Sequence, residues 1–195
     1  MNSRFRRKLG ERRYKRMFVI VAEGTVTEQE YFALFNDESI VHIKCLRHRH
    51  NLPPKDALKQ AHDYIREQHI RKRDEVWVVV DRDSWLEKHL SELHAWSQTS
   101  ENYGFALSNP KFEYWLLLHF EDATGISSGD DCNTRLHKYL PKYNKHINTS
   151  DFTRDRIKEA AKRARKRDTP ACTDWPRSTG TTLYRLVEKI LQEPE

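Results

Sequence analysis

The strongest constraint on the fold is a short apolar run, residues 18–22, that ends on a carboxylate and a glycine. The run reads FVIVA and is followed by Glu23 and Gly24. A run rich in β-branched residues is typical of a strand that is buried on both faces. Thr27 stands as an N-cap with Glu30 in capping-box position, so a helix is predicted to start directly after the turn. In open α/β sheets, ligand crevices form at the carboxyl ends of such strands.

A second buried-strand pattern ends in two further carboxylates. Residues 75–80 read EVWVVV and are followed by Asp81, Arg82 and Asp83. Side chains two positions apart on an extended chain point to the same side, so Asp81 and Asp83 can converge on one hard cation. An isolated Asp-x-Asp pair is more often an ordinary turn. If the two strands are neighbours, ~5 Å apart, Glu23 faces the pair, and this combination favours a Mg²⁺ or Mn²⁺ site.

The other patterns complete an α/β arrangement. Two more strands are predicted at residues 40–46 and 105–108. Helical periodicity occurs in residues 56–71, 84–98, 111–120, 132–168 (broken near Pro141) and 183–191, and residues 122–131 have the composition of a loop. Alternation of strands and helices predicts a mostly parallel four-stranded sheet with helices on both faces, followed by a C-terminal helical part. A 2-1-3-4 strand order would bring Glu23 to the Asp81/Asp83 pair.

One more carboxylate stands out in the most apolar helix. Glu113 lies in the first turn of the predicted helix 111–120, which is hydrophobic nearly all round and therefore mostly buried. A buried charge needs a partner. The N-terminus of the helix could stabilise Glu113, or Glu113 could join or orient the acidic cluster. Trp85 and Trp96 fall near helical spacing and are predicted to pack in the core.

The charge balance favours a polyanionic partner. The chain has 35 Lys and Arg against 29 Asp and Glu, a net charge of +6. Positive charge is concentrated in an N-terminal arm, residues 1–17, in Arg47 and Arg49, and in one predicted helix. The cations of that helix are Lys162, Arg163, Arg165, Lys166 and Arg167. These groups could contact a phosphate backbone, although a basic helix is often only a solvated face.

The remaining composition predicts a cytoplasmic protein without a membrane span. The three cysteines are widely spaced and show no Cys-x-x-Cys or zinc-ligand pattern. No signal-peptide core precedes Glu23, and no stretch approaches the ~20 apolar residues of a spanning helix. Oligomeric state is left open, including a homo-oligomer.

Four segments together resemble the RloB-like family. They are EGTVTEQEYF after the first strand, VVVDRD at the third, SNPKFEYWLLLHF and WPRSTGTTLYRLVEKI. The resemblance runs from about residue 18 to about residue 190. It implies a TOPRIM-like (Rossmann-like) nuclease domain of prokaryotic defence systems, here residues 18–195, that acts beside an ATPase. It also implies that Glu113 and Glu28, which lie in the motifs SNPKFE and EGxxTE, belong to the site.

These observations predict a metal-dependent nuclease that hydrolyses phosphodiester bonds of DNA or RNA. Asp81 and Asp83 are predicted metal ligands, and Glu23 is a ligand or a general acid/base. Glu113 is a supporting carboxylate, and Glu28 completes the catalytic set. One alternative is a nucleic-acid-binding subunit without turnover of its own. Another is a nucleotidyl transferase or primase-like enzyme. The sequence has no P-loop pattern, which argues against this alternative.

Overall fold

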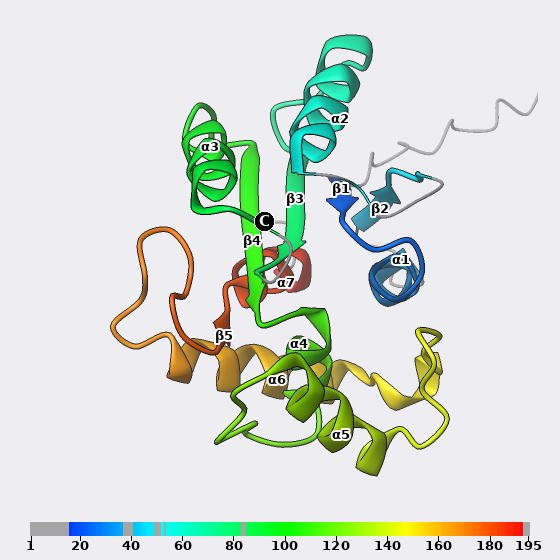
Figure 1. The fold of residues 1–195 in the computed structure, drawn as a ribbon. Helices are drawn as coiled ribbons and strands as arrows, with labels where there is room; N and C mark the ends of the chain where they lie inside the picture. Colours follow the sequence, from blue (N-terminus) through cyan, green and yellow to red (C-terminus); the bar gives the residue numbers. More distant parts are fainter. Residues whose placement is uncertain (1–15, 37–40, 49–51, 53, 83–84, 193–195) are drawn as a thin grey trace, which may run out of the picture.

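The chain forms one α/β structure around a twisted sheet (Figure 1). The computed structural model describes residues 16–36, 41–48, 52, 54–82 and 85–192. The strands within these ranges are β1 (Arg16–Ala22), β2 (Val41–Cys45), β3 (Glu75–Asp81), β4 (Tyr103–Asn109) and β5 (Gly180–Thr181). The α-helices are α1 (Thr27–Ala33), α2 (Pro54–Glu67), α3 (Glu87–Ser97), α4 (Phe112–Leu117), α5 (Gly129–Tyr139), α6 (Arg154–Arg167) and α7 (Leu183–Leu191). Short 3-10 helices cover Leu34–Asn36 and Thr149–Asp151.

The strand order of the sheet is β2-β1-β3-β4-β5, which contains the predicted 2-1-3-4 order. The first four strands are parallel, and β1 pairs with β3 so that Ala22 lies opposite Val79. The prediction of four strands is wrong, because β5 joins the sheet antiparallel to β4. Since β5 is two residues long and contains no apolar side chain, it has none of the alternation by which a strand is recognised.

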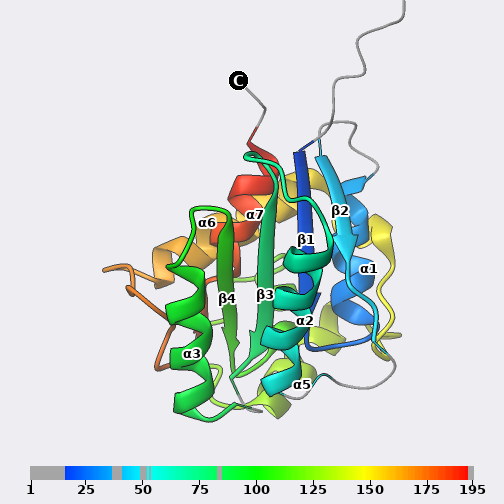
Figure 2. The same cartoon turned by 90° about the horizontal axis from the view of Figure 1, so that it is seen from above.

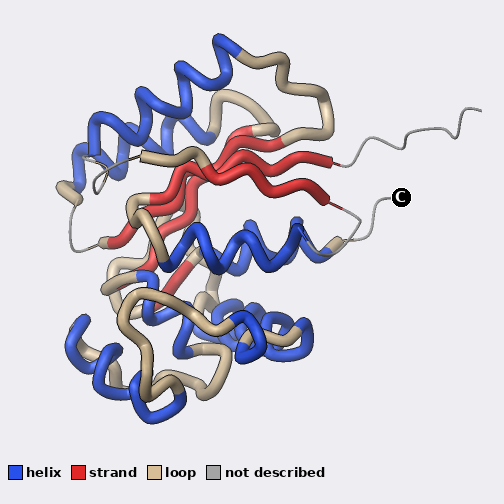
Figure 3. Tube along the Cα trace, turned by 90° about the vertical axis from the view of Figure 1, so that its right-hand side faces the viewer, coloured by secondary structure: helices blue, strands red, loops and turns tan. Residues whose placement is uncertain are grey.

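Helices cover both faces of the sheet, as predicted. α2 and α3 lie on one face, and α1, α4, α6 and α7 lie on the other (Figures 2 and 3). Side chains of β1 alternate between the two cores: Phe18 and Ile20 pack toward the α1 side, and Val19 and Val21 toward the α2 side. All four are fully buried. The continuous apolar run in β1 therefore reflects a strand with two buried faces.

A buried polar contact joins α1 to the segment after α4. Tyr31 meets the rings of its neighbours edge-on, including Phe112, Trp115 and His119. The Nδ1 of His119 lies 3.0 Å from the carbonyl oxygen of Trp115, to which it can only donate, so Nε2 accepts from the Tyr31 hydroxyl at 3.1 Å. Burial lowers the pKa of His119 to about 3, which keeps the ring neutral. The contact holds α1 and α4 in one relative position.

Two element boundaries differ from the sequence prediction. α5 begins at Gly129, inside the predicted loop 122–131, because the Ser128 hydroxyl accepts from the Asp131 amide at 3.1 Å and caps the helix. The prediction of a capping box at α1 is also wrong, because Val26 is the N-cap and no side chain caps the helix. Thr27 and Glu30 instead bind the α5–α6 loop. Among the described residues, no helix is long and apolar enough to cross a membrane.

Gly104 allows the sheet to pack against a tryptophan. A Cβ at this position would overlap the buried indole ring of Trp77 on the neighbouring strand. We expect Gly104→Ala to lower the free energy of unfolding by about 1–3 kcal/mol, because the ring must leave its packed position. Urea denaturation measures the change. The loss should shrink in a Trp77→Leu background, and an equal loss in both backgrounds would show that the ring is not the obstacle.

Candidate active site

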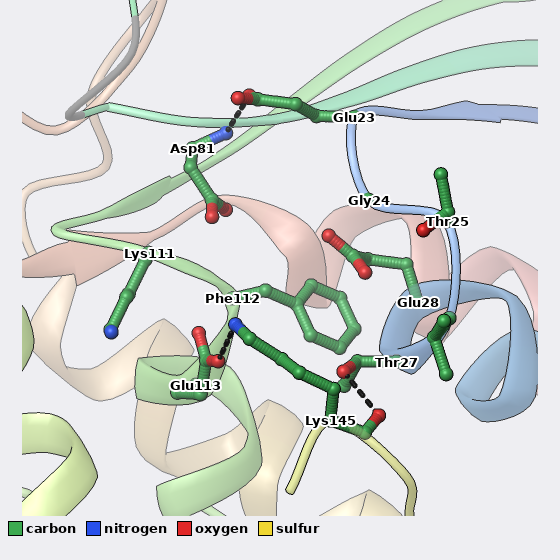
Figure 4. Close-up of a pocket in the computed structure, with 11 residues that line it drawn as sticks. Glu23, Gly24, Thr25, Thr27, Glu28, Asp81, Lys111, Phe112, Glu113 and Lys145 are labelled. Carbon is green, nitrogen blue, oxygen red and sulfur yellow. Dashed lines mark hydrogen bonds and ion pairs between the residues drawn. The ribbon is translucent and has the colours of Figure 1, made fainter. Parts of the chain in front are cut away.

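Carboxylates from four different elements line one pocket at the carboxyl ends of β1 and β3. The pocket has a volume of about 290 Å³ (Figure 4). Its acidic residues are Glu23 after β1, Glu28 on α1, Asp81 at the end of β3 and Glu113 on α4. Asp83 lies outside the described residues. The structure thus brings together four of the five carboxylates that the sequence singled out.

Glu23 is oriented by its neighbours on the sheet edge. Its Oε2 accepts from the Trp85 indole nitrogen at 2.6 Å and from the Asp81 backbone amide at 3.2 Å. The Glu23 amide donates to the carbonyl of Val79 at 3.1 Å, which continues the pairing of β1 with β3 beyond the last strand residue. Trp85 packs in the core as predicted, but its indole N–H also holds a site carboxylate.

Asp81 reaches the pocket from the adjacent strand. Its backbone amide binds Glu23, while its carboxylate points toward the side of the pocket where Lys111 and Glu113 lie (Figure 4). The parallel pairing of β1 with β3 therefore places two acidic side chains at one edge, as the strand order predicted.

Glu28 is buried against the turn that follows β1. A Cβ at Gly24 would overlap the Glu28 carboxylate, so only glycine leaves room for the carboxylate there. The side chain points into the pocket (Figure 4). Burial raises the pKa of Glu28, and the nearby charges of Glu113 and Glu23 act in the same direction. Glu28 therefore holds a proton more readily than an ordinary glutamate.

Glu113 is also buried but has a cationic partner. Its Oε1 accepts from the Lys145 ammonium at 2.7 Å and from the Tyr143 hydroxyl at 2.9 Å. Burial by itself would raise the pKa of Glu113, but the hydrogen bond and charge of Lys145, helped by Lys111, outweigh it and lower the pKa. The sequence allowed two explanations for Glu113: stabilisation by the helix N-terminus or a place in the acidic cluster. Its position in the pocket agrees with the second. The partner of its buried charge is Lys145.

The α5–α6 loop closes the pocket on the side of α1. The Thr27 hydroxyl donates to the Lys145 carbonyl at 2.6 Å, and the Glu30 carboxylate accepts from the Ile147 amide at 2.8 Å. His146 Nδ1 also contacts Glu30 at 2.6 Å. These contacts explain why neither Thr27 nor Glu30 caps α1.

Most of the predicted phosphate-binding cations of α6 are engaged within the protein. Arg163 donates to the Leu118 carbonyl at 2.7 Å and pairs with Asp122, and Arg165 pairs with Glu188. Arg167 donates to the Asp122 carbonyl at 3.2 Å. Lys162 and Lys166 are exposed. Arg47 is exposed beyond β2, and Arg49 lies outside the described residues.

The donor chemistry of the pocket fits a hard cation. Carboxylate oxygens are the preferred protein ligands of Mg²⁺ and Mn²⁺. The pKa of Glu28 is raised mainly by burial, and the nearby charges of Glu113 and Glu23, which a cation would offset, add to that effect. Glu23 and Asp81 would hold the ion from the sheet edge. Among the described residues, no three His, Cys, Asp or Glu side chains already converge as a metal-binding group.

Several pocket residues were not predicted from the sequence. They are Thr25, Val26, Thr27, Lys111, Phe112 and Lys145. Lys111 sits in the SNPKFE motif two residues before Glu113, and that proximity was a usable signal. Lys145 lies in a polar loop far along the chain, where no local pattern marks it.

Glu28→Gln should reveal the cost of charging this buried carboxyl. Because the folded state binds the Glu28 proton more tightly than the unfolded state, the free energy of unfolding falls as pH rises above the ordinary value of 4.5. Glutamine does not ionise, so the variant does not lose this stability as pH rises. We therefore expect the Tm difference, variant minus wild type, to increase between a pH below 4.5 and neutral pH when both proteins are measured in EDTA.

Glu92→Gln, an exposed position on α3, is the matched control and should show no such trend. A Tm difference for Glu28→Gln that stays constant across pH would contradict the assignment.

Comparison with known proteins gives one match, to a family. No curated protein and no solved structure matches the chain. The family model described as RloB-like protein matches residues 18–190, from β1 to the last turn of α7. The match covers most of the chain and includes all the acidic residues of the pocket. The chain therefore belongs to the RloB-like family.

Proposed function

We propose that this protein is a metal-dependent nuclease that hydrolyses phosphodiester bonds of DNA or RNA. The observation that carries the proposal is the convergence of Glu23, Asp81, Glu28 and Glu113 on one pocket that also contains Lys111 and Lys145. Four carboxylates around one pocket are electrostatically costly. A site that binds a divalent cation and a phosphodiester accounts for both the acidic residues and the lysines.

Each carboxylate has a distinct task in this proposal. Glu23 and Asp81 hold a Mg²⁺ or Mn²⁺ ion, with Asp83 as the third ligand expected from the sequence. The bound ion would supply charge neutralisation at the phosphate and a lower pKa for an attacking water. The Trp85 indole and the Asp81 amide fix the Glu23 carboxylate, so its orientation does not depend on the ion.

Glu28 and Glu113 differ in proton affinity, which favours different roles. The pKa of Glu28 is raised and that of Glu113 is lowered. Groups whose environments push their pKa values apart are suited to acid and base tasks in the same site. When the P–O bond breaks, the leaving oxygen needs a proton, and Glu28, whose pKa is raised by burial, is suited to hold one. Glu113 stays ionised and positions Lys145.

Family membership supports a proposal for the biological context. We infer a role in antiviral defence beside an ATPase partner, since the family includes nucleases of such systems. The sequence itself has no P-loop pattern, so an energy-dependent trigger would come from the partner. The alternative of a binding subunit without turnover remains one outcome of the experiment below.

Removal of a predicted metal ligand should abolish cleavage. We expect wild-type protein to cut labelled single-stranded DNA, double-stranded DNA or total RNA with Mg²⁺ or Mn²⁺ and not with EDTA. Asp81→Asn should lower the rate by at least about 100-fold, an order typical of lost charge stabilisation in a site. Asp56→Asn, an exposed position on α2, controls for the loss of one acidic charge.

The outcome separates the candidates. Binding by both proteins with no cleavage, also after addition of the proposed ATPase partner, would favour the binding subunit. Equal cleavage by wild type and Asp81→Asn would reject the proposed site.

The cations of α6 should divide into structural and exposed groups. Arg163→Ala removes contacts to Leu118 and Asp122, so we expect about 1–3 kcal/mol less stability in urea denaturation. Lys166→Ala should stay within about 0.5 kcal/mol of wild type. If α6 contacts the substrate, Lys166→Ala weakens nucleic-acid binding and makes it less salt-dependent. No change in binding would assign α6 a purely structural role.

A further inference from the structure

Lys145 lies at the pocket in an unusual backbone conformation. It sits in the loop between α5 and α6 and has a φ of 79°. A non-glycine residue in this region of φ is uncommon, and such strain persists only where surrounding contacts hold it. Contacts with α1 hold this conformation: Thr27 binds the Lys145 carbonyl, and Glu30 binds His146 and the Ile147 amide.

The side chain is far more exposed than the carboxylate it contacts. The Lys145 side chain is 67% exposed, whereas that of Glu113 is 4% exposed. A lysine that served only to neutralise a buried carboxylate would be expected to be buried with it. An ammonium group has three N–H donors. Among the described residues, the hydrogen bond from Lys145 Nζ goes to Glu113 alone, so donors remain directed away from that carboxylate.

The lysines of the pocket and three of its carboxylates come from different parts of the fold. Glu23, Glu28 and Asp81 come from the sheet edge and α1, while Lys111 precedes α4 and Lys145 extends from the α5–α6 loop to Glu113 on α4 (Figure 4). Burial by itself would lower the pKa of Lys145, but the hydrogen bond and charge of Glu113 raise it, and the charges of Glu28 and Asp81 add to this effect. Lys145 therefore interacts electrostatically with carboxylates of the sheet edge and α1. A phosphodiester is an anion with two non-bridging oxygens. Among the described residues that line the pocket, Lys111 and Lys145 are the ones that offer such an oxygen a positive charge.

We propose that Lys145 binds a non-bridging oxygen of the substrate phosphodiester, with Lys111 beside it, and that Glu113 holds the ammonium in place for this contact. The inference rests on the proposed function, since it assigns the phosphate-binding side of the same site. Lys145 contacts the substrate directly, and Glu113, Thr27 and Glu30 are positioning residues.

The test measures the binding of short labelled single-stranded DNA and RNA oligonucleotides by fluorescence anisotropy, in EDTA and in Ca²⁺. We expect Lys145→Ala to weaken binding about tenfold, the effect of losing one charge-assisted hydrogen bond. The slope of log affinity against log salt should decrease in magnitude by about 0.7, as expected for one phosphate contact on a single strand. Lys145→Arg should retain most of the affinity. Lys142→Ala removes an exposed charge from the same loop and should have a much smaller effect.

A double-mutant cycle with Glu113→Gln separates binding from folding. Lys145→Ala alone leaves Glu113 buried without its cation and is expected to unfold more easily. In the Glu113→Gln background that charge is absent, so the loss of Lys145 no longer destabilises the fold. If Lys145 binds phosphate, Lys145→Ala still weakens oligonucleotide binding in this background. If it serves only Glu113, binding there is unchanged, and the inference is wrong.

The outcomes distinguish this inference from the proposed function. Oligonucleotide binding that is insensitive to Lys145 in both backgrounds rejects the inference and leaves the nuclease proposal standing. Failure of wild type to bind any of the oligonucleotides rejects both. Binding that depends on Lys145 without metal-dependent cleavage, also in the presence of the proposed ATPase partner, supports the contact and rejects the nuclease.

Discussion

The parallel pairing of β1 with β3 is the interaction on which the rest of the site depends. The register that places Ala22 opposite Val79 brings Glu23 and Asp81 to the same edge and lets the Asp81 amide bind the Glu23 carboxylate. Because side chains alternate along a strand, a register shift of one residue would turn every β1 side chain to the other face. The two buried cores on either side of β1 prevent such a shift, so the packing of the sheet fixes the distance between two acidic residues.

The second constraint is the burial of like charges. Glu28 and Glu113 are both buried, yet their pKa values move in opposite directions, because only Glu113 has the Lys145 ammonium as a partner. The Tyr31–His119 contact holds α1 and α4, which carry these two carboxylates, at a constant separation. An uncharged hydrogen bond suits this task, since a neutral imidazole brings no unpaired charge into a fully buried position.

The α5–α6 loop connects the C-terminal helical part to the site. It supplies Tyr143 and Lys145, which bind Glu113, and it is held by Thr27 and Glu30 of α1. The basic helix α6 follows this loop, and its arginines mostly bind carbonyls and carboxylates of the protein. Among the described residues, the positive charge that lines the pocket comes from Lys111 and Lys145 and not from the basic helix α6.

Sequence patterns alone predicted the parallel strands and the helices on both faces, because apolar runs and strand ends are local features. They placed Glu23 beside Asp81 on the condition of a 2-1-3-4 strand order, which the pairing of β1 with β3 fulfils. They also indicated Glu113, from its place in an apolar helix and from a motif, and Glu28 from a motif alone. Tertiary structure decided the rest. β5 depends on pairing with β4, and Thr27 and Glu30 abandon the expected capping box because a loop more than 100 residues later offers them other partners. Lys145 reaches the pocket through those contacts, and no local pattern reports an interaction between residues so far apart in the chain.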